Sequence, residues 1–239
     1  MARKLLVILF LVFAGCNSDD NYSGNATVDG AEVGDPGNPS TTDPGPGTDP
    51  GPGTDPNDNP NLLTVAVKYV SLRDANAGTA TPTKAAVTTL MANASKIWAQ
   101  CDIGFTLEAF VEGTGSEYGL SLTASSFSTL RDIRNSFDNG NSALIVRIES
   151  FTDSSELGTS NAYSTMPGSN PEGIVVERYS QTSQMLISHE LGHLIGGLGH
   201  TTGTNLMNHF VSAQNTPISA SQCKTARATL QNSHAKWLR

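Results

Sequence analysis

The residues that could do chemistry are concentrated in segment 189–200, which reads His-Glu-Leu-Gly-His-Leu-Ile-Gly-Gly-Leu-Gly-His. Residues four apart lie on one face of a helix, so His189 and His193 can bind one metal ion together. Glu190 projects from the same turn, beside that ion. The glycines that follow can end the helix and allow His200 to return toward the metal. Three imidazole ligands, an open position for water and a nearby carboxylate are typical of a zinc hydrolase.

The residue types missing from the downstream chain limit the choice of the third metal ligand. From Leu194 to Arg239 there is no Asp or Glu, so this segment cannot supply an acidic third ligand. We therefore expect His200 as the third ligand, with His209 as the alternative. A helix with ordinary surface or core histidines is the competing interpretation. It is disfavoured because all five histidines lie in the last quarter of the chain, and because glycines follow where helix-forming residues would be expected.

The segment resembles the metzincin metalloproteases, whose motif is His-Glu-x-x-His-x-x-Gly-x-x-His followed by a methionine turn. Asn205-Leu206-Met207-Asn208 stands in the place of that turn, and the short step to it is most similar to the matrixin-like branch. The resemblance implies that the zinc ligands are His189, His193 and His200. It further implies Glu190 as the general base and Met207 as the turn residue beneath the metal.

One feature departs from the family pattern. The third histidine comes one residue later than in the motif, so one glycine in Gly196-Gly197-Leu198-Gly199 is additional. A glycine-rich turn can absorb one residue, because glycine reaches positive φ without a steric cost. No tyrosine follows Met207, so the tyrosine ligand of some metzincins is missing.

The implied activity is zinc-dependent hydrolysis of peptide bonds in a polypeptide substrate. A zinc-activated water would attack the carbonyl, with Glu190 as its general base. The metal itself would stabilise the oxyanion, because no Arg or Lys lies near the motif. One Zn²⁺ is the expected cofactor, and an additional Ca²⁺ ion is an open alternative that the sequence does not support. The alternative is a catalytically silent surface lipoprotein of the same fold that binds proteins or peptides. The intact Glu190 argues against it.

Residues 1–15 are predicted to be a lipoprotein signal peptide. Arg3-Lys4 precedes an apolar run, Leu5–Ala14, that is too short to span a bilayer. Phe13-Ala14-Gly15-Cys16 resembles the lipobox of bacterial lipoproteins, in which cleavage precedes a lipid-bearing cysteine. We therefore expect lipidation at Cys16 and a protein anchored in the bacterial cell envelope, facing the periplasm or the exterior. An ordinary secretory signal with an incidental cysteine is the alternative.

Residues 16–60 are predicted to be an acidic, Pro/Gly-rich, disordered tether. Segment 17–60 holds nine of the 22 acidic residues and no Lys or Arg, and Asp43–Thr48 repeats as Asp49–Thr54. Such a segment cannot bury enough apolar surface to offset its ordering entropy. A pro-segment that blocks the zinc is the alternative. The rest of the chain is close to neutral and has no basic stripe, so we expect no nucleic-acid partner.

Residues 61–239 have the length of one catalytic domain. Apolar alternation or short apolar runs predict strands at 63–72, 103–111, 143–148 and 173–177. Helical periodicity predicts helices from Pro82 to Trp98, from 127 to 137, from Thr182 or Ser183 through His193, and after a capping box at Ser219-Ala220-Ser221-Gln222. The order predicts an α/β (α+β) fold. The resemblance implies a metzincin-like twisted mixed sheet with a small C-terminal subdomain, and we expect a monomer.

Two further sites are expected from the sequence. Ser160, Asn161, Ala162 and Tyr163 precede the catalytic helix, where the edge strand of metzincins binds substrate by backbone pairing; a solvated loop is the alternative. Cys101 and Cys223 remain if Cys16 carries lipid, and an oxidising compartment allows them to form a disulfide. Two buried free thiols are the alternative.

Overall fold

The computed structural model describes residues 14–16, 59–74, 81–152, 157, 160–178, 180 and 183–239. The chain divides into two compact units, residues 1–19 with 61–239, and residues 20–60. The predicted signal peptide up to residue 13, and residues 17–58 of the predicted tether, lie outside the described residues. Within the described ranges, no helix is long and apolar enough to cross a membrane.

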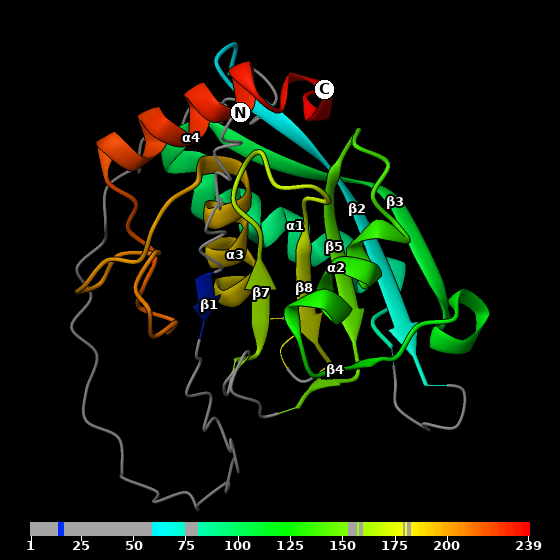
Figure 1. Ribbon diagram of the computed structural model, residues 1–239. Coiled ribbons are helices and arrows are strands. Elements are labelled where there is room, and N and C mark those ends of the chain that lie inside the picture. The colour runs from blue at the N-terminus through cyan, green and yellow to red at the C-terminus, as the bar shows by residue number, and fades with distance from the viewer. Residues whose placement is uncertain are drawn as a thin grey trace, which may run out of the picture. The chain divides into compact units, whose positions relative to one another are not determined.

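A six-stranded mixed sheet organises the first unit, in the order β1-β7-β8-β5-β2-β3 (Figure 1). Strands β2, β3, β5 and β8 are mutually parallel, and β7 pairs antiparallel with both β8 and β1. A separate parallel pair joins β4 and β6. The strand bounds are β1 Ala14–Cys16, β2 Leu63–Arg73, β3 Ile103–Thr114, β4 Thr123–Ala124, β5 Ala143–Ile148, β6 Ser150–Phe151, β7 Ala162–Ser164 and β8 Ile174–Glu177.

The sheet is buried on both faces, which explains its apolar strands. Successive side chains of a strand point to opposite faces, so each central strand contributes to two apolar clusters. In β5, Ala143 and Ile145 join the cluster on one face, whereas Leu144 and Val146 join the cluster on the other. This arrangement requires helices on both sides of the sheet.

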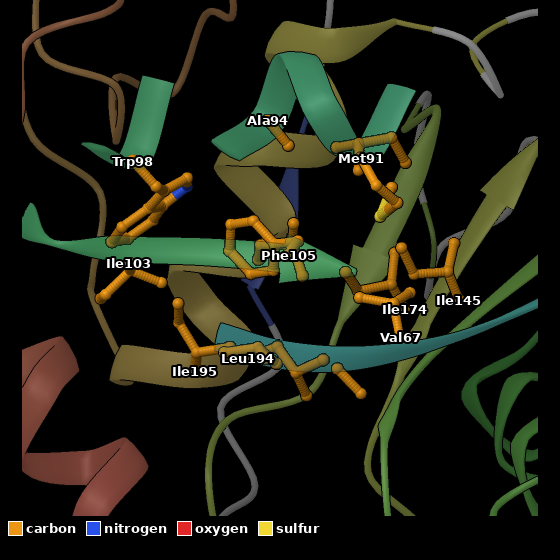
Figure 2. Close-up of a cluster of buried hydrophobic side chains, with 14 of the residues drawn as sticks. Val67, Met91, Ala94, Trp98, Ile103, Phe105, Ile145, Ile174, Leu194 and Ile195 are labelled. Carbon is orange, nitrogen blue, oxygen red and sulfur yellow. The ribbon is translucent and has the colours of Figure 1, made fainter. Parts of the chain in front are cut away.

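Helices α1 (Lys84–Trp98) and α3 (Gln184–Gly196) cover the first face. Figure 2 shows part of this core, where Trp98 and Phe105 lie near Leu194 and Ile195. The prediction that α1 begins at Pro82 was wrong. Thr83 Oγ1 accepts the N–H of Ala86 at 3.2 Å and caps the helix, which therefore begins at Lys84.

Helix α2 (Phe127–Asn135) covers the second face, and Figure 1 shows it on the opposite side of the sheet from α1. Ser126 Oγ caps it by accepting the N–H of Thr129 at 3.3 Å. Leu130 and Ile133 are buried against the sheet. The helix ends two residues before the predicted Phe137, but that ring still packs into the same cluster.

The C-terminal part folds back onto the first face. Helix α4 (Ala220–Asn232) begins at the predicted capping box, in which Ser219 and Gln222 bond each other's backbone. A disulfide joins Cys101 to Cys223, which are 122 residues apart in the chain. Short 3-10 helices are η2 Ala99–Cys101, η3 Gly115–Tyr118 and η4 Ala235–Trp237. The predicted α/β class, with a mostly parallel twisted sheet between helices, is confirmed.

Candidate metal centre

Helix α3 carries the first two histidines into the protein interior. Ser183 Oγ caps the helix by accepting the N–H of Leu186 at 3.3 Å. The indole Nε1 of Trp98 donates to the carbonyl of Ser188 at 3.1 Å and so holds α3 against α1. Directly after Ser188, the side chains of His189, Glu190 and His193 are all 0% exposed. The packing of a helix that is buried from Met185 to Gly196 therefore sets the position of these three side chains.

Three imidazoles converge at the end of this helix. His193 Nε2 lies 3.1 Å from His189 Nε2 and 3.2 Å from His200 Nε2, and the ligand atoms of the three residues lie within 4.8 Å of one another. Two nitrogens bound to one zinc at 2.0–2.1 Å in tetrahedral geometry are about 3.3 Å apart. The two separations that involve His193 match this value, so the three rings form a group that could hold one metal ion.

Hydrogen bonds fix the orientation and the tautomer of the two buried rings. His189 Nδ1 lies 2.7 Å from the carbonyl oxygen of Leu206, and His193 Nδ1 lies 2.5 Å from that of Leu198. Carbonyl oxygens only accept, so Nδ1 must donate in both rings and Nε2 keeps its lone pair. These carbonyls are the orienting partners that ligand histidines require.

Burial keeps the same two rings neutral. It lowers the pKa of His189 to about 4 and the pKa of His193 to about 3. Burial and then His209 also lower the pKa of the more exposed His200. Metal ligands must be deprotonated, so the three rings are in the ligand-competent form at neutral pH.

The glycine-rich turn brings His200 next to the two buried histidines. Gly197 ends α3 in the left-handed region at φ 58°, and its N–H donates to His193 O at 2.9 Å. The N–H of Leu198 donates a hydrogen bond to the carbonyl of Gly192, and the carbonyl of Leu198 accepts one from the His193 ring. A Cβ at Gly199 would meet nothing within 4 Å. Space is therefore available beside the turn at Gly199, directly before His200.

His209 lies beside the three histidines rather than among them. Its ring centroid is 4.9 Å from that of His200, and it is half-buried. The group that could hold one ion contains His200 and not His209. Of the two candidates for the third ligand, the geometry favours His200.

Met207 packs directly against helix α3 at Gly192. Its side chain is 0% exposed, and a Cβ on Gly192 would overlap its Sδ atom. Thr201 N donates to Met207 O at 2.7 Å, so the segments on both sides of the turn are joined. Gly192 is thus required for the close approach between α3 and the turn.

A polar network that sequence reasoning missed holds this turn. Asn205 Oδ1 accepts the N–H of Met207 at 2.8 Å, and the Asn205 amide exchanges two hydrogen bonds with Gln222, at 2.8 and 3.1 Å. Gln100 accepts from Ile218 N at 2.9 Å and donates to Thr216 O at 2.9 Å. The only available signal was the capping box at Ser219, which identifies Gln222 as a cap but not as a partner of Asn205.

The strand predicted to bind substrate lies next to α3. Strand β7 covers Ala162–Ser164, so Ser160 and Asn161 precede it. Its outer edge pairs antiparallel with β1, with Cys16 opposite Ala162 and Ala14 opposite Ser164. This edge therefore accepts an extended segment in antiparallel orientation.

Comparisons with known proteins identify no family. No family model matches the chain, and no curated protein matches it. The crystal structure of metalloproteinase-II from Bacteroides fragilis is similar at 17% identity and a TM-score of 0.47, over 74% of this chain and 60% of that one. A chaperone-substrate complex is similar at 13% identity and a TM-score of 0.43, over 74% of this chain and 35% of that one. The chain thus spans less than two thirds of either protein, and similarities this distant transfer no function.

Proposed function

We propose that this protein is a zinc-dependent endopeptidase of the metzincin type. The observation that carries the proposal is the convergence of three imidazole nitrogens at the end of a helix that also buries Glu190 completely. A group of three neutral nitrogen ligands leaves a fourth position open, as catalytic zinc sites do. The sequence motif supplies the second support, because Glu190 directly follows the first ligand.

The rings of His189 and His193 have the orientation and the protonation state that metal binding requires before any ion binds. The carbonyls of Leu206 and Leu198 point Nε2 of His189 and His193 toward the same position. Burial disfavours protonation of both rings, so protons compete weakly with the metal at neutral pH. A bound zinc ion would supply a Lewis acid and lower the pKa of a water molecule toward neutrality.

Glu190 is the proposed general base. Its carboxylate is 0% exposed, and the residue directly follows His189 in the chain, which supports a role beside the proposed ion site. In the proposed reaction it takes a proton from the attacking water and returns it to the leaving amine. General acid–base catalysis of this kind contributes about 10²–10⁴-fold to the rate.

The outer edge of β7 is the proposed binding place for the polypeptide substrate. The pairing of β1 with Ala162–Ser164 supports this, since it shows that the edge can receive an extended chain antiparallel to β7. If the chain is cleaved before Cys16, residues 14 and 15 leave this edge. A substrate would then take their place by backbone hydrogen bonds.

We also propose that the protein is anchored to the bacterial cell envelope through lipid on Cys16. The support is the lipobox-like sequence up to that residue. Growth of cells with a radiolabelled fatty acid tests it. The wild-type protein should take up the label, and a Cys16→Ala variant should not.

The decisive test of activity compares the full-length wild type with Glu190→Gln and with Ser188→Ala, a buried residue of the same helix. Each protein is analysed for zinc and assayed on a denatured protein substrate. We expect about one zinc per chain in all three proteins. Hydrolysis should fall by about 10²–10⁴-fold in Glu190→Gln only, because that variant lacks the general base.

Two results would contradict the proposal. Absence of zinc from the wild type would remove the metal centre. Zinc without Glu190-dependent hydrolysis of any protein tested would support the alternative function, a silent surface lipoprotein that binds proteins or peptides.

A further inference from the structure

A second site lies on the other side of the sheet from the metal centre. A cavity of about 210 Å³ opens between α2 and the segment 165–171 that follows β7. Arg131 and Arg134 of α2 line it, together with Thr165 and Pro171 of that segment. Helix α2 packs on the face opposite α3, so the cavity is separate from the three histidines.

Arg134 is a buried cation in the wall of this cavity. The residue is 2% exposed, and its Nε atom is buried without a hydrogen-bond partner. Among the residues that the structure describes, no carboxylate forms an ion pair with it. Burial lowers the pKa of Arg134 to about 10, so the guanidinium remains charged at neutral pH. A buried charge without a partner is costly, and a bound anion would remove that cost.

The surroundings favour negative charge. Arg131 lies three residues before Arg134 on the same helix face and also lines the cavity, and none of the lining residues is acidic. The hydroxyl of Ser128 lies one turn before Arg131 on this face. The cavity is therefore lined by two arginines and a serine, and none of its lining residues carries a carboxylate.

The size and the remaining walls restrict the ligand. About 210 Å³ is below the range of roughly 300–1,000 Å³ for drug-sized ligands. Phe127 and Pro171 provide apolar surface. A guanidinium binds a carboxylate through two parallel hydrogen bonds. Of the two arginines, only Arg134 is buried, so a ligand with one negative charge matches the one buried positive charge. A phosphate dianion would bring a second negative charge that must also be desolvated.

We propose that this cavity binds a small organic monocarboxylate. The carboxylate pairs with Arg134, and the apolar body of the ligand packs between Phe127 and Pro171. The site is independent of the proposed peptidase activity, because it uses none of the residues of the metal centre.

Titration of the full-length protein with benzoate tests the proposal. The readouts are the thermal unfolding midpoint and the NMR signal of the Arg134 Nε–H group. A carboxylate can also bind a zinc ion, so the titration is done with a chelator present. Benzamide is the uncharged control of the same shape, and inorganic phosphate is the control for a general ionic effect.

We expect saturable benzoate binding with a Kd of about 1 mM or tighter, and a shift of the Arg134 signal. In Arg134→Met, which keeps the length of the side chain, binding should weaken at least ~10-fold, because charge-assisted hydrogen bonds are lost. Arg134→Lys keeps the charge but not the planar fork and should also weaken binding. Arg131→Gln should have the smallest effect, because Arg131 is exposed.

Several outcomes would overturn the proposal. They are no saturable binding of benzoate, acetate or hexanoate up to ~50 mM, equal binding by wild type and both Arg134 variants, and equal effects of benzoate and benzamide. If phosphate binds more tightly than every carboxylate at the same Arg134, the ligand class is wrong.

Discussion

Two of the three histidines of the candidate metal centre are oriented by backbone carbonyls of the turns that follow helix α3. His189 is oriented by Leu206 of the methionine turn, and His193 by Leu198 of the glycine-rich turn. Loss of such orienting partners typically costs 10–100-fold in metal affinity. No side-chain substitution removes a carbonyl, so the affinity of this centre depends on the conformation of both turns.

The lowered pKa values of His189 and His193 predict acid destabilisation of the metal-free protein. The unfolded chain binds protons near pH 6.5, whereas the folded chain binds them only near pH 4 and pH 3. Between these values the unfolded state holds more protons, so the free energy of unfolding falls as the pH falls. The loss between pH 6.5 and pH 3 should be on the order of several kcal/mol.

Urea unfolding in the presence of a chelator, repeated across this pH range, measures the effect. A His193→Asn variant, which cannot titrate at that position, should show a shallower dependence. A wild-type stability that is constant from pH 6.5 to pH 4 would contradict the lowered pKa values.

Removal of His200 or of His209 distinguishes a ligand from a neighbour. His200→Ala should lower zinc affinity by more than ~100-fold, the upper range for orienting partners, because it removes a direct ligand. His209→Ala should change affinity by less than ~10-fold, since its ring only contacts that of His200. Competition with a zinc-binding dye measures both affinities. The reverse order of effects would make His209 the third ligand.

At the scale of elements, α3, the methionine turn and α4 form one connected support. Gly192 allows the sulfur of Met207 to touch the backbone of α3. Asn205 shapes the turn and is held by Gln222 at the start of α4. Gln222, which caps α4, thereby also stabilises the methionine turn that packs against α3.

Two glycine substitutions test this support. In Gly192→Ala the new methyl group would overlap Met207 Sδ, so the free energy of unfolding should fall by about 1–3 kcal/mol and zinc affinity should fall with it. Gly199→Ala is the matched control, because a Cβ there meets nothing within 4 Å and the residue does not have positive φ. It should be neutral or stabilising by up to ~1 kcal/mol.

Denaturant unfolding and zinc titration of both variants provide the comparison. Equal behaviour of Gly192→Ala and Gly199→Ala would show that the contact between α3 and Met207 does not matter for the site.

At the scale of the whole molecule, the disulfide joins the two regions that support α3, namely the end of α1 and helix α4. Cys101 follows α1, which holds α3 through Trp98, and Cys223 lies in α4, which holds the methionine turn. The bond closes a loop of 122 residues that includes the whole candidate metal centre. Cross-linking of such distant residues limits the conformational freedom of the unfolded chain.

Removal of the disulfide should therefore lower stability more than a surface substitution does. A Cys101→Ala/Cys223→Ala double variant should lose about 2–4 kcal/mol of unfolding free energy. Equilibrium unfolding of this variant, and of the wild type with and without a reducing agent, measures the loss. The reducing agent should have no effect on the variant. An unchanged stability of the reduced wild type would contradict the expected contribution.

The sequence was sufficient to predict those features that depend on a local periodic pattern. Spacings of three and four place His189, Glu190 and His193 on one helix, and alternation identified the central strands, because both patterns follow from backbone geometry alone. The helix bounds were less certain. Thr83 competes with Pro82 for the start of α1, and a single capping hydrogen bond decides between them.

Tertiary contacts decided the remaining features. The sequence left His200 and His209 as alternatives, because a flexible glycine turn has no periodicity from which to place its last residue. Only the folded chain, with Leu198 bonded to both Gly192 and His193, places His200 in the group of three histidines that could hold one ion. The pairing of Asn205 with Gln222, and the burial of Arg134 in a cavity wall, involve segments far apart in the chain. Such contacts have no local sequence signature, since they depend on how helices and turns pack in three dimensions.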